Sequence, residues 1–229
     1  MVARSYDIHI HPLGDSALVV ELAHEVSQEA HHKIMHFLHQ LEERPFHGFI
    51  EAVPTYTNVT VFYDPRKVAQ VYSVHHTVYE TVSEMMQMYT LKNDYEKEYH
   101  GQRVEIPVIY GGESGPDLAH VAKENGLTEE EVIQIHSSVE YVVFMIGFAP
   151  GFPFLGGMDK RIEMPRKEHP RANVPAGSVG IAGEQTGIYP FNSPGGWQII
   201  GKTSVDLFLP TEDPPTRLQA GDRLKFVPV

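Results

Sequence analysis

Two arginines that each follow a proline are the side chains of this sequence best suited to act on an anion. They are Arg166, which follows Pro165, and Arg171, which follows Pro170. The proline fixes the backbone before the arginine, and the planar guanidinium presents five donors that suit a carboxylate or a phosphate. The alternative for each arginine is a surface salt bridge, because such pairs are common and contribute little.

Neutral polar side chains and glycines lie on the turns around these arginines. Loops at one end of a β domain meet at a common mouth, so groups on successive turns can line one pocket. We expect Arg171 and His136 to act in catalysis, and a second group to bind the substrate: Arg166, Gly177, Ser178, Gln185, Thr186, Tyr189, Ser193 and Gly195. For His136 the alternative is a buried structural histidine.

Other catalytic signatures are missing from the sequence. No nucleophile stands beside an obvious general base, so the candidate groups suit electrostatic stabilisation of a charged intermediate better than covalent catalysis. There is no Gly-x-x-x-x-Gly-Lys-Ser/Thr loop. Of the 14 histidines, His32, His36 and His39 share the polar face of one expected helix, which favours a solvated surface. We therefore predict no protein-bound metal.

Residues 147–201, which carry most of the candidate site, are rich in glycine, proline and aromatic residues. Glycine permits positive φ, proline restricts φ, and aromatic side chains have no use in a flexible linker. The pattern predicts ordered loops on short strands, as in a β-barrel. Trp197, the single tryptophan, is expected to pack in the core.

The preceding part of the chain alternates strands and helices. We expect two short strands within residues 8–22, a helix that begins near Ser27, a strand pair within 49–63, and one long helix from Asp64 to Met86. This order predicts an α+β sandwich of ferredoxin-like type. The charged segment Lys92–Gln102 marks the boundary, which gives domains of residues 1–92 and 93–229.

The second domain begins with an alternating strand at residues 103–110. Pro107 within it predicts an edge position or a strand start. Two short helices follow, the second with a capping box at Thr128. A buried strand at residues 141–146 and a closing strand at the end of the sequence complete the expected elements.

Composition bounds the class of protein. A chain of 229 residues can bury a substantial core. The net charge of −12, with no basic stripe, argues against nucleic-acid binding. No apolar run is long enough to span a membrane, no signal peptide is evident, and no cysteine is present, so the cytoplasm is the expected compartment.

A series of motifs follows the pattern of one family in order. The motifs are Tyr110-Gly111-Gly112, Gly115-Pro116-Asp117-Leu118, His136, Tyr141, Gly147-Phe148 through Gly157, Pro170-Arg171, Val174 through Val179, Gln185 through Pro190, Ser193 through Trp197, and Gly221-Asp222. Over essentially its whole length the chain resembles the KipI/PxpB family, also called allophanate hydrolase subunit 1. One departure is His169, where the pattern leads us to expect a small hydroxyl residue.

The resemblance implies an N-terminal ferredoxin-like domain and a C-terminal cyclophilin-like β-barrel. It implies that the chain is the B-type subunit of a bacterial 5-oxoprolinase. The assembled enzyme opens the lactam of 5-oxoproline to glutamate with hydrolysis of ATP, and it uses Mg²⁺ with the ATP. It also implies a homologous C-type partner (KipA/PxpC-like) and an A-type partner, and little activity of the chain alone. Arginine forks and backbone amides would suit the charge of a phosphorylated lactam intermediate.

Two other functions occur among proteins that resemble this chain. KipI-like proteins inhibit a sensor histidine kinase of sporulation by binding it through the cyclophilin-like domain, which would make the chain a binding module. Urea carboxylase contains a similar carboxyltransferase region. A biotin-dependent function would need a Met-Lys-Met carrier lysine and an ATP-grasp domain on separate chains, because neither is present here.

Overall fold

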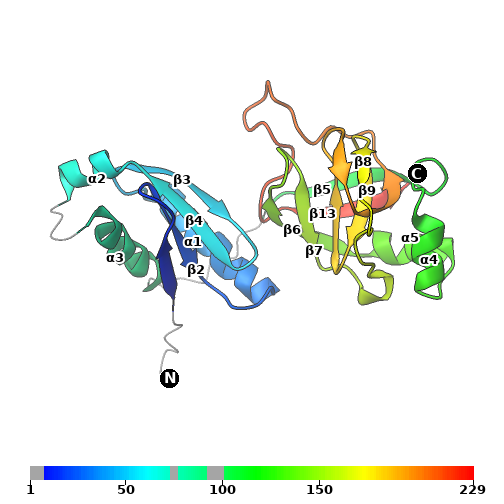
Figure 1. Ribbon diagram of the computed structural model, residues 1–229, viewed down its shortest axis with the longest axis horizontal. Helices are drawn as coiled ribbons and strands as arrows, with labels where there is room; N and C mark the ends of the chain where they lie inside the picture. Colours follow the sequence, from blue (N-terminus) through cyan, green and yellow to red (C-terminus); the bar gives the residue numbers. More distant parts are fainter. Residues whose placement is uncertain (1–7, 73–76, 92–100) are drawn as a thin grey trace. The chain divides into compact units, whose positions relative to one another are not determined.

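The computed structural model describes residues 8–72, 77–91 and 101–229 (Figure 1). The chain divides into two compact units, Met1–Tyr99 and His100–Val229. The predicted boundary segment Lys92–Gln102 lies almost entirely outside the described residues. The architecture is mixed α+β, with a four-stranded sheet in the first unit and a closed barrel in the second.

The first unit is an antiparallel sheet packed against helices. Its strands are β1 (His9–Pro12), β2 (Ala17–Glu21), β3 (Phe49–Pro54) and β4 (Asn58–Tyr63), in the order β1-β2-β4-β3, and its helices are α1 (Gln28–Glu43), α2 (Pro65–Val71) and α3 (Val78–Leu91). The α1 helix begins where predicted, because Ser27 Oγ accepts a hydrogen bond from the Ala30 amide at 3.0 Å. Helices α1 and α3 pack against each other and against the sheet.

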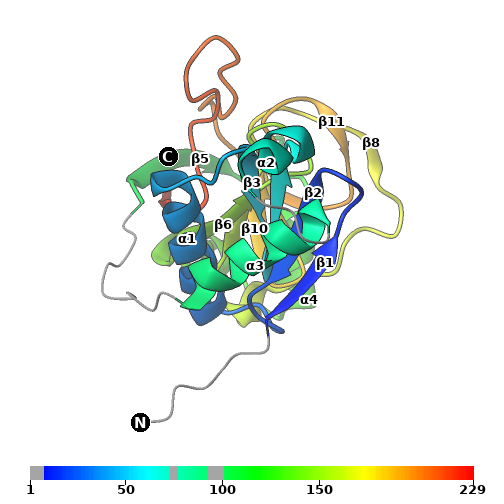
Figure 2. The same cartoon turned by 90° about the vertical axis from the view of Figure 1, so that its left-hand side faces the viewer.

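The expected long helix from Asp64 to Met86 is wrong, since α2 and α3 are separate segments (Figure 2). Tyr72 ends α2 in an extended conformation, and its hydroxyl accepts a hydrogen bond from the His47 amide at 3.2 Å. A new capping box starts α3. Its Thr77 Oγ1 accepts from the Glu80 amide, and a Glu80 carboxylate oxygen accepts from the Thr77 amide.

The second unit is a closed barrel with strand order β10-β7-β6-β13-β5-β12-β9. The strands are β5 (Arg103–Tyr110), β6 (Glu140–Ile146), β7 (Pro153–Gly156), β9 (Ser178–Ala182), β10 (Gln185–Ile188), β12 (Gln198–Lys202) and β13 (Arg223–Pro228). Strands β8 (Arg171–Val174) and β11 (Ser193–Gly195) form a separate ribbon. Helices α4 (Leu118–Glu124) and α5 (Glu129–Ser138) and the short 3₁₀ helix η1 (Lys160–Ile162) complete the unit.

The prediction of an edge strand around Pro107 is wrong, because β5 lies between β12 and β13 in the closed barrel. The parallel pairing with β13 runs along β5 and places Val227 opposite Pro107. Strand β12 pairs with β5 only at Ile109 and Tyr110. The proline therefore lies where β5 has a partner on one side, which is where a missing N–H donor is tolerated.

Apolar side chains from every wall fill the barrel, among them Ile106, Val143, Ile181 and Phe226, all of which are fully buried. The capping box at Thr128 is present at the start of α5. No helix in the described ranges combines the length and the apolar character needed to cross a membrane.

Candidate functional site

A buried carboxylate, Asp117, collects the cations of the candidate site. The two Asp117 oxygens accept hydrogen bonds from Arg171 Nη1 at 2.7 Å and Nη2 at 2.8 Å, which is a bidentate pair. Lys167 Nζ lies 2.8 Å from Asp117 Oδ1, and the Ile199 amide donates to Oδ2 at 2.7 Å. The side chain of Asp117 is 7% exposed, against 30% for Arg171. We call these four residues the Asp117 cluster.

The electrostatics of the Asp117 cluster favour the ionised carboxylate. Burial alone would raise the pKa of Asp117, but the hydrogen bonds from Arg171, Lys167 and the Ile199 amide, together with the charge of Arg171, hold it below its usual value. The cluster contains two cations and one anion. One positive charge is therefore not balanced within the cluster.

Three segments that are far apart in sequence meet at this carboxylate. Arg171 pairs with Gly195 in the β8–β11 ribbon. The Lys167 amide donates to the Gly196 carbonyl at 2.7 Å. Asp117 directly precedes α4 and follows Gly115 by two residues, and an added Cβ at Gly115 would lie 2.0 Å from the Ile200 carbonyl oxygen. The close approach requires glycine at position 115, and it fixes Asp117 against β12.

An aromatic group lies beneath the ribbon. Tyr189 is 1% exposed and packs edge-on against Phe152 at 5.2 Å, and Phe152 packs edge-on against Trp197 at 5.3 Å. A Cβ at Gly195 would lie 2.3 Å from Tyr189 Oη, so the ribbon sits directly on this ring. Burial raises the pKa of Tyr189, and the charges of Arg166 and Arg171 oppose that shift.

The structure brings six of the expected site residues together. The Gly177 amide donates to the Tyr189 carbonyl at 2.8 Å, and the Tyr189 amide donates to the Ser178 carbonyl at 2.9 Å. Both amides are thus used within the barrel. The six residues are Arg166, Arg171, Gly177, Ser178, Tyr189 and Gly195. The Arg171 fork, however, already holds a carboxylate of the chain itself.

His136 and Thr186 form a separate group inside the barrel. His136 is fully buried, with Nδ1 2.7 Å from Tyr110 Oη and Nε2 2.9 Å from Thr186 Oγ1. Its ring stacks on Phe226 with centroids 4.5 Å apart. Thr186 Oγ1 also contacts the Gly180 carbonyl at 3.0 Å, which identifies the hydroxyl as donor to that carbonyl and as acceptor from the histidine. The structure therefore places His136 in the core, apart from Arg171.

The two remaining site candidates lie at the starts of β10 and β11. Gln185 begins β10 opposite Ala182 and is half-buried. Ser193 pairs with Val174 in the ribbon, and its buried Oγ has no hydrogen-bond partner among the described residues. The Arg171 hydrogen bonds described above do not include either of these side chains.

Burial lowers the pKa of His136 to about 3, so acid should destabilise the second unit. The unfolded chain binds a proton to this side chain near pH 6.5 while the folded barrel does not, so stability falls as the pH drops below about 6.5. The contribution is about 1.4 kcal/mol per pH unit. In His136→Gln, the free energy of unfolding, measured with urea between pH 6.5 and 4.5, should depend less steeply on pH by this amount. Equal slopes in both proteins would contradict the prediction.

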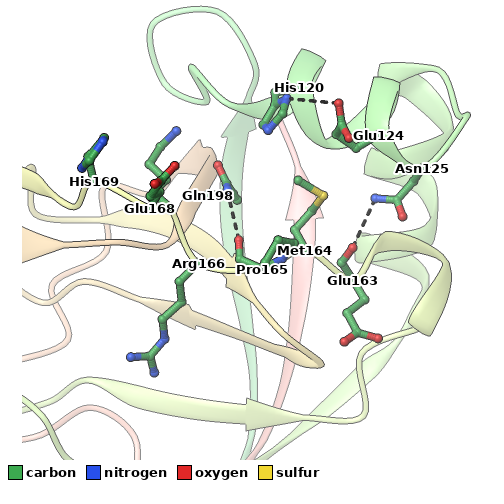
Figure 3. Close-up of a pocket in the computed structure, with 11 residues that line it drawn as sticks. His120, Glu124, Asn125, Glu163, Met164, Pro165, Arg166, Glu168, His169 and Gln198 are labelled. Carbon is green, nitrogen blue, oxygen red and sulfur yellow. Dashed lines mark hydrogen bonds and ion pairs between the residues drawn. The ribbon is translucent and has the colours of Figure 1, made fainter.

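An open hollow of about 630 Å³ adjoins the Asp117 cluster (Figure 3). Its lining comprises His120, Glu124, Asn125, Glu163, Met164, Pro165, Arg166, Lys167, Glu168, His169 and Gln198. In Figure 3 the Arg166 side chain extends away from His120 and Glu124. The floor is held in place by the Gln198 amide nitrogen, which donates to the Pro165 carbonyl at 3.1 Å.

Asp117, Lys167 and Gln198 were not among the site residues expected from the sequence. Asp117 carried a signal, because a Gly-Pro-Asp step before an apolar helix marks an N-cap, but a cap alone does not reveal an ion pair. Lys167 directly follows Arg166. Within residues 8–72, 77–91 and 101–229, no three His, Cys, Asp or Glu side chains group closely enough to hold a metal ion.

Most of the chain, from the first unit into the second, matches a known family. The family of the carboxyltransferase domain, subdomain C and D, matches residues 8–218, and the chain belongs to it.

Relatives within this family share a name. The chain is 51% identical over 227 residues to the B-type subunit of 5-oxoprolinase from Bacillus subtilis, with 95% of this chain and 91% of that protein covered. It is 42% identical over 217 residues to the B-type subunit of 5-oxoprolinase from Escherichia coli O157:H7, with 94% of each covered. Among solved structures, TTHA0988 is similar with a TM-score of 0.78 and 35% identity over 93% of this chain. The chain spans only 40% of TTHA0988.

Proposed function

We propose that this chain is the B-type subunit of a bacterial ATP-dependent 5-oxoprolinase and helps convert 5-oxoproline to glutamate. The observation that carries the proposal is the similarity, along nearly the full length of both chains, to proteins named as the B-type 5-oxoprolinase subunit, at 51% and 42% identity. Identity at this level over both units argues for a shared role and not for a shared fold alone. A cytoplasmic location accompanies this function.

The candidate site suits the charge that such a reaction develops. Lactams open slowly, and transfer of a phosphoryl group from ATP, with Mg²⁺, to the lactam oxygen would activate the ring. The excess positive charge of the Asp117 cluster is suited to a carboxylate or a phosphorylated oxygen. In this proposal Arg171 is held in place by Asp117, while Arg166 has no bidentate partner among the hydrogen bonds of the described residues.

The same proposal includes partners and domains. A homologous C-type subunit and an A-type subunit complete the enzyme, and hydrolysis of the cyclic amide requires all three. The first unit corresponds to a ferredoxin-like domain at residues 1–92 and the second to a cyclophilin-like barrel at residues 93–229. The site lacks a nucleophile beside a general base, which agrees with dependence on other chains.

We expect the purified chain alone to show little 5-oxoproline-dependent ATPase activity. Addition of the C-type and A-type subunits should produce activity at least about 100-fold above the chain alone, because the reacting groups are then assembled in one site. The measurement is phosphate release with and without 5-oxoproline, for each combination of subunits. Full turnover by this chain alone, or none with all three, contradicts the proposal. In the second case, inhibition of a sensor kinase by the chain would support the binding-module alternative.

A further inference from the structure

A buried acceptor at the floor of the hollow has no donor. Gln198 is 3% exposed. Its side-chain amide is oriented by a hydrogen bond that Nε2 donates to the Pro165 carbonyl. Its Oε1 has no hydrogen-bond partner among the described residues. In Figure 3 the two ends of the amide lie on opposite sides, with the nitrogen toward Pro165. An unpaired buried acceptor is costly, so a group that supplies an N–H at this point gains binding free energy.

We propose that the hollow binds a small molecule that carries an N–H donor next to a carboxylate, with Gln198 Oε1 as acceptor for the N–H and Lys167 as partner of the carboxylate. Lys167 lines the hollow and bonds to Asp117 Oδ1, while Asp117 Oδ2 accepts from the Ile199 amide, the residue after Gln198. The acceptor and the cation therefore come from neighbouring segments.

The charge of the Asp117 cluster supports a carboxylate at this position. Asp117 forms its bidentate pair with Arg171, so it offers Lys167 a single oxygen contact. An ammonium group has three donors, and only one is used in that contact. The other donors can meet an incoming carboxylate. Glu124, Glu163 and Glu168 line the remaining wall and disfavour a ligand with more than one negative charge.

This inference rests on the proposed function for the identity of the ligand, which is 5-oxoproline. Its lactam N–H and its carboxylate are attached to the same carbon atom, which matches the adjacent acceptor and cation. Because Gln198 Oε1 is covered in the structure, binding must displace side chains at the floor of the hollow. Glu168 and His169 line the hollow and are exposed, so they can move at little cost.

The test is a titration of the full chain by amide NMR, alone and with the C-type subunit. The probes are 5-oxoproline, 1-methyl-5-oxoproline, which lacks the N–H, and 2-pyrrolidinone, which lacks the carboxylate. We expect 5-oxoproline to shift the amides of residues 163–169 and 196–199. Each analogue should bind at least about 10-fold more weakly, because one lacks the N–H donor for Gln198 and the other lacks the carboxylate for Lys167.

Gln198→Leu should weaken 5-oxoproline binding at least about 10-fold while the protein stays folded, because an apolar side chain of similar size removes the unpaired acceptor. The matched control is Gln219→Leu, at an exposed glutamine before β13. Equal binding of 5-oxoproline and its N-methyl analogue, shifts confined to other segments, or no binding with or without the C-type subunit overturns the inference. An assembled enzyme that is active and indifferent to Gln198→Leu refutes this site and leaves the proposed function. Binding without turnover refutes the function and leaves the site.

Discussion

Replacing Asp117 with asparagine is expected to lower the free energy of unfolding of the second unit by about 2–4 kcal/mol, because two cations lose their shared buried anion. An asparagine keeps one acceptor for the Ile199 amide but presents an NH₂ group where the guanidinium of Arg171 now donates. Arg171 and Lys167 would then repel each other without compensation. In the assembled enzyme, activity should fall at least about 100-fold, because Arg171, once displaced, would lie at the wrong distance from the substrate charge that it stabilises.

The measurement is urea unfolding followed by the fluorescence of Trp197, which is buried near this site. Because the pKa of Asp117 is lowered in the folded state, its stabilisation is present above the ordinary carboxylate pKa near 4 and disappears as the pH falls below the folded value. The variant and the parent should therefore converge in acid. The control is Glu184→Gln, in an exposed pair with Lys160, which should leave stability unchanged. An equal loss in both variants would show that a buried carboxylate is not the cause.

Gly177→Ala is expected to destabilise the barrel by about 3–5 kcal/mol. This figure combines the cost of a left-handed backbone conformation at an alanine with the cost of a clash against the main chain. Gly177 has φ +79°, and an added Cβ would lie 2.1 Å from the Thr203 carbonyl oxygen. That oxygen cannot move freely, because the Thr203 amide donates to the Gly177 carbonyl at 2.9 Å. Strands β9 and β12 would have to separate at this end.

Gly183→Ala is the matched control for this substitution. Gly183 also has a positive φ, +57°, but an added Cβ meets no atom within 4 Å. It should cost only the left-handed conformation, about 1–2 kcal/mol. Denaturant unfolding of the two variants separates strain from clash. If Gly177→Ala were no worse than Gly183→Ala, the close approach to Thr203 would carry no energetic weight.

Local patterns allowed the periodic elements to be predicted from the sequence. Ser27 marked the start of α1, two short strands were expected within residues 8–22, and Thr128 marked the start of α5. Each of these signals lies within a few residues of the element it defines. The break between α2 and α3 carried a signal of the same kind, the capping box at Thr77, and the continuous apolar spacing obscured it.

The pairings of the site could not be predicted in this way. Arg171 was expected to hold an anion, but its partner Asp117 lies 54 residues away and meets it only when the barrel and the ribbon have formed. The Ile199 amide that completes the cluster is 82 residues from Asp117. His136 similarly depends on Thr186, 50 residues distant. Residue type indicates which chemistry a side chain can perform, while these contacts depend on strand order.

The position of β13 also determines when the second unit can fold during synthesis. This strand is the last of the barrel to be made, and it lies between β5 and β6. The Gln102 amide reaches Asp222 Oδ1 at 3.0 Å across 120 residues of sequence. At roughly 5–20 residues per second, a ribosome needs on the order of ten seconds to add that stretch. Until β13 is made, the edge of β5, and that of β6 once it has been made, lack this partner and are open to pairing with other chains.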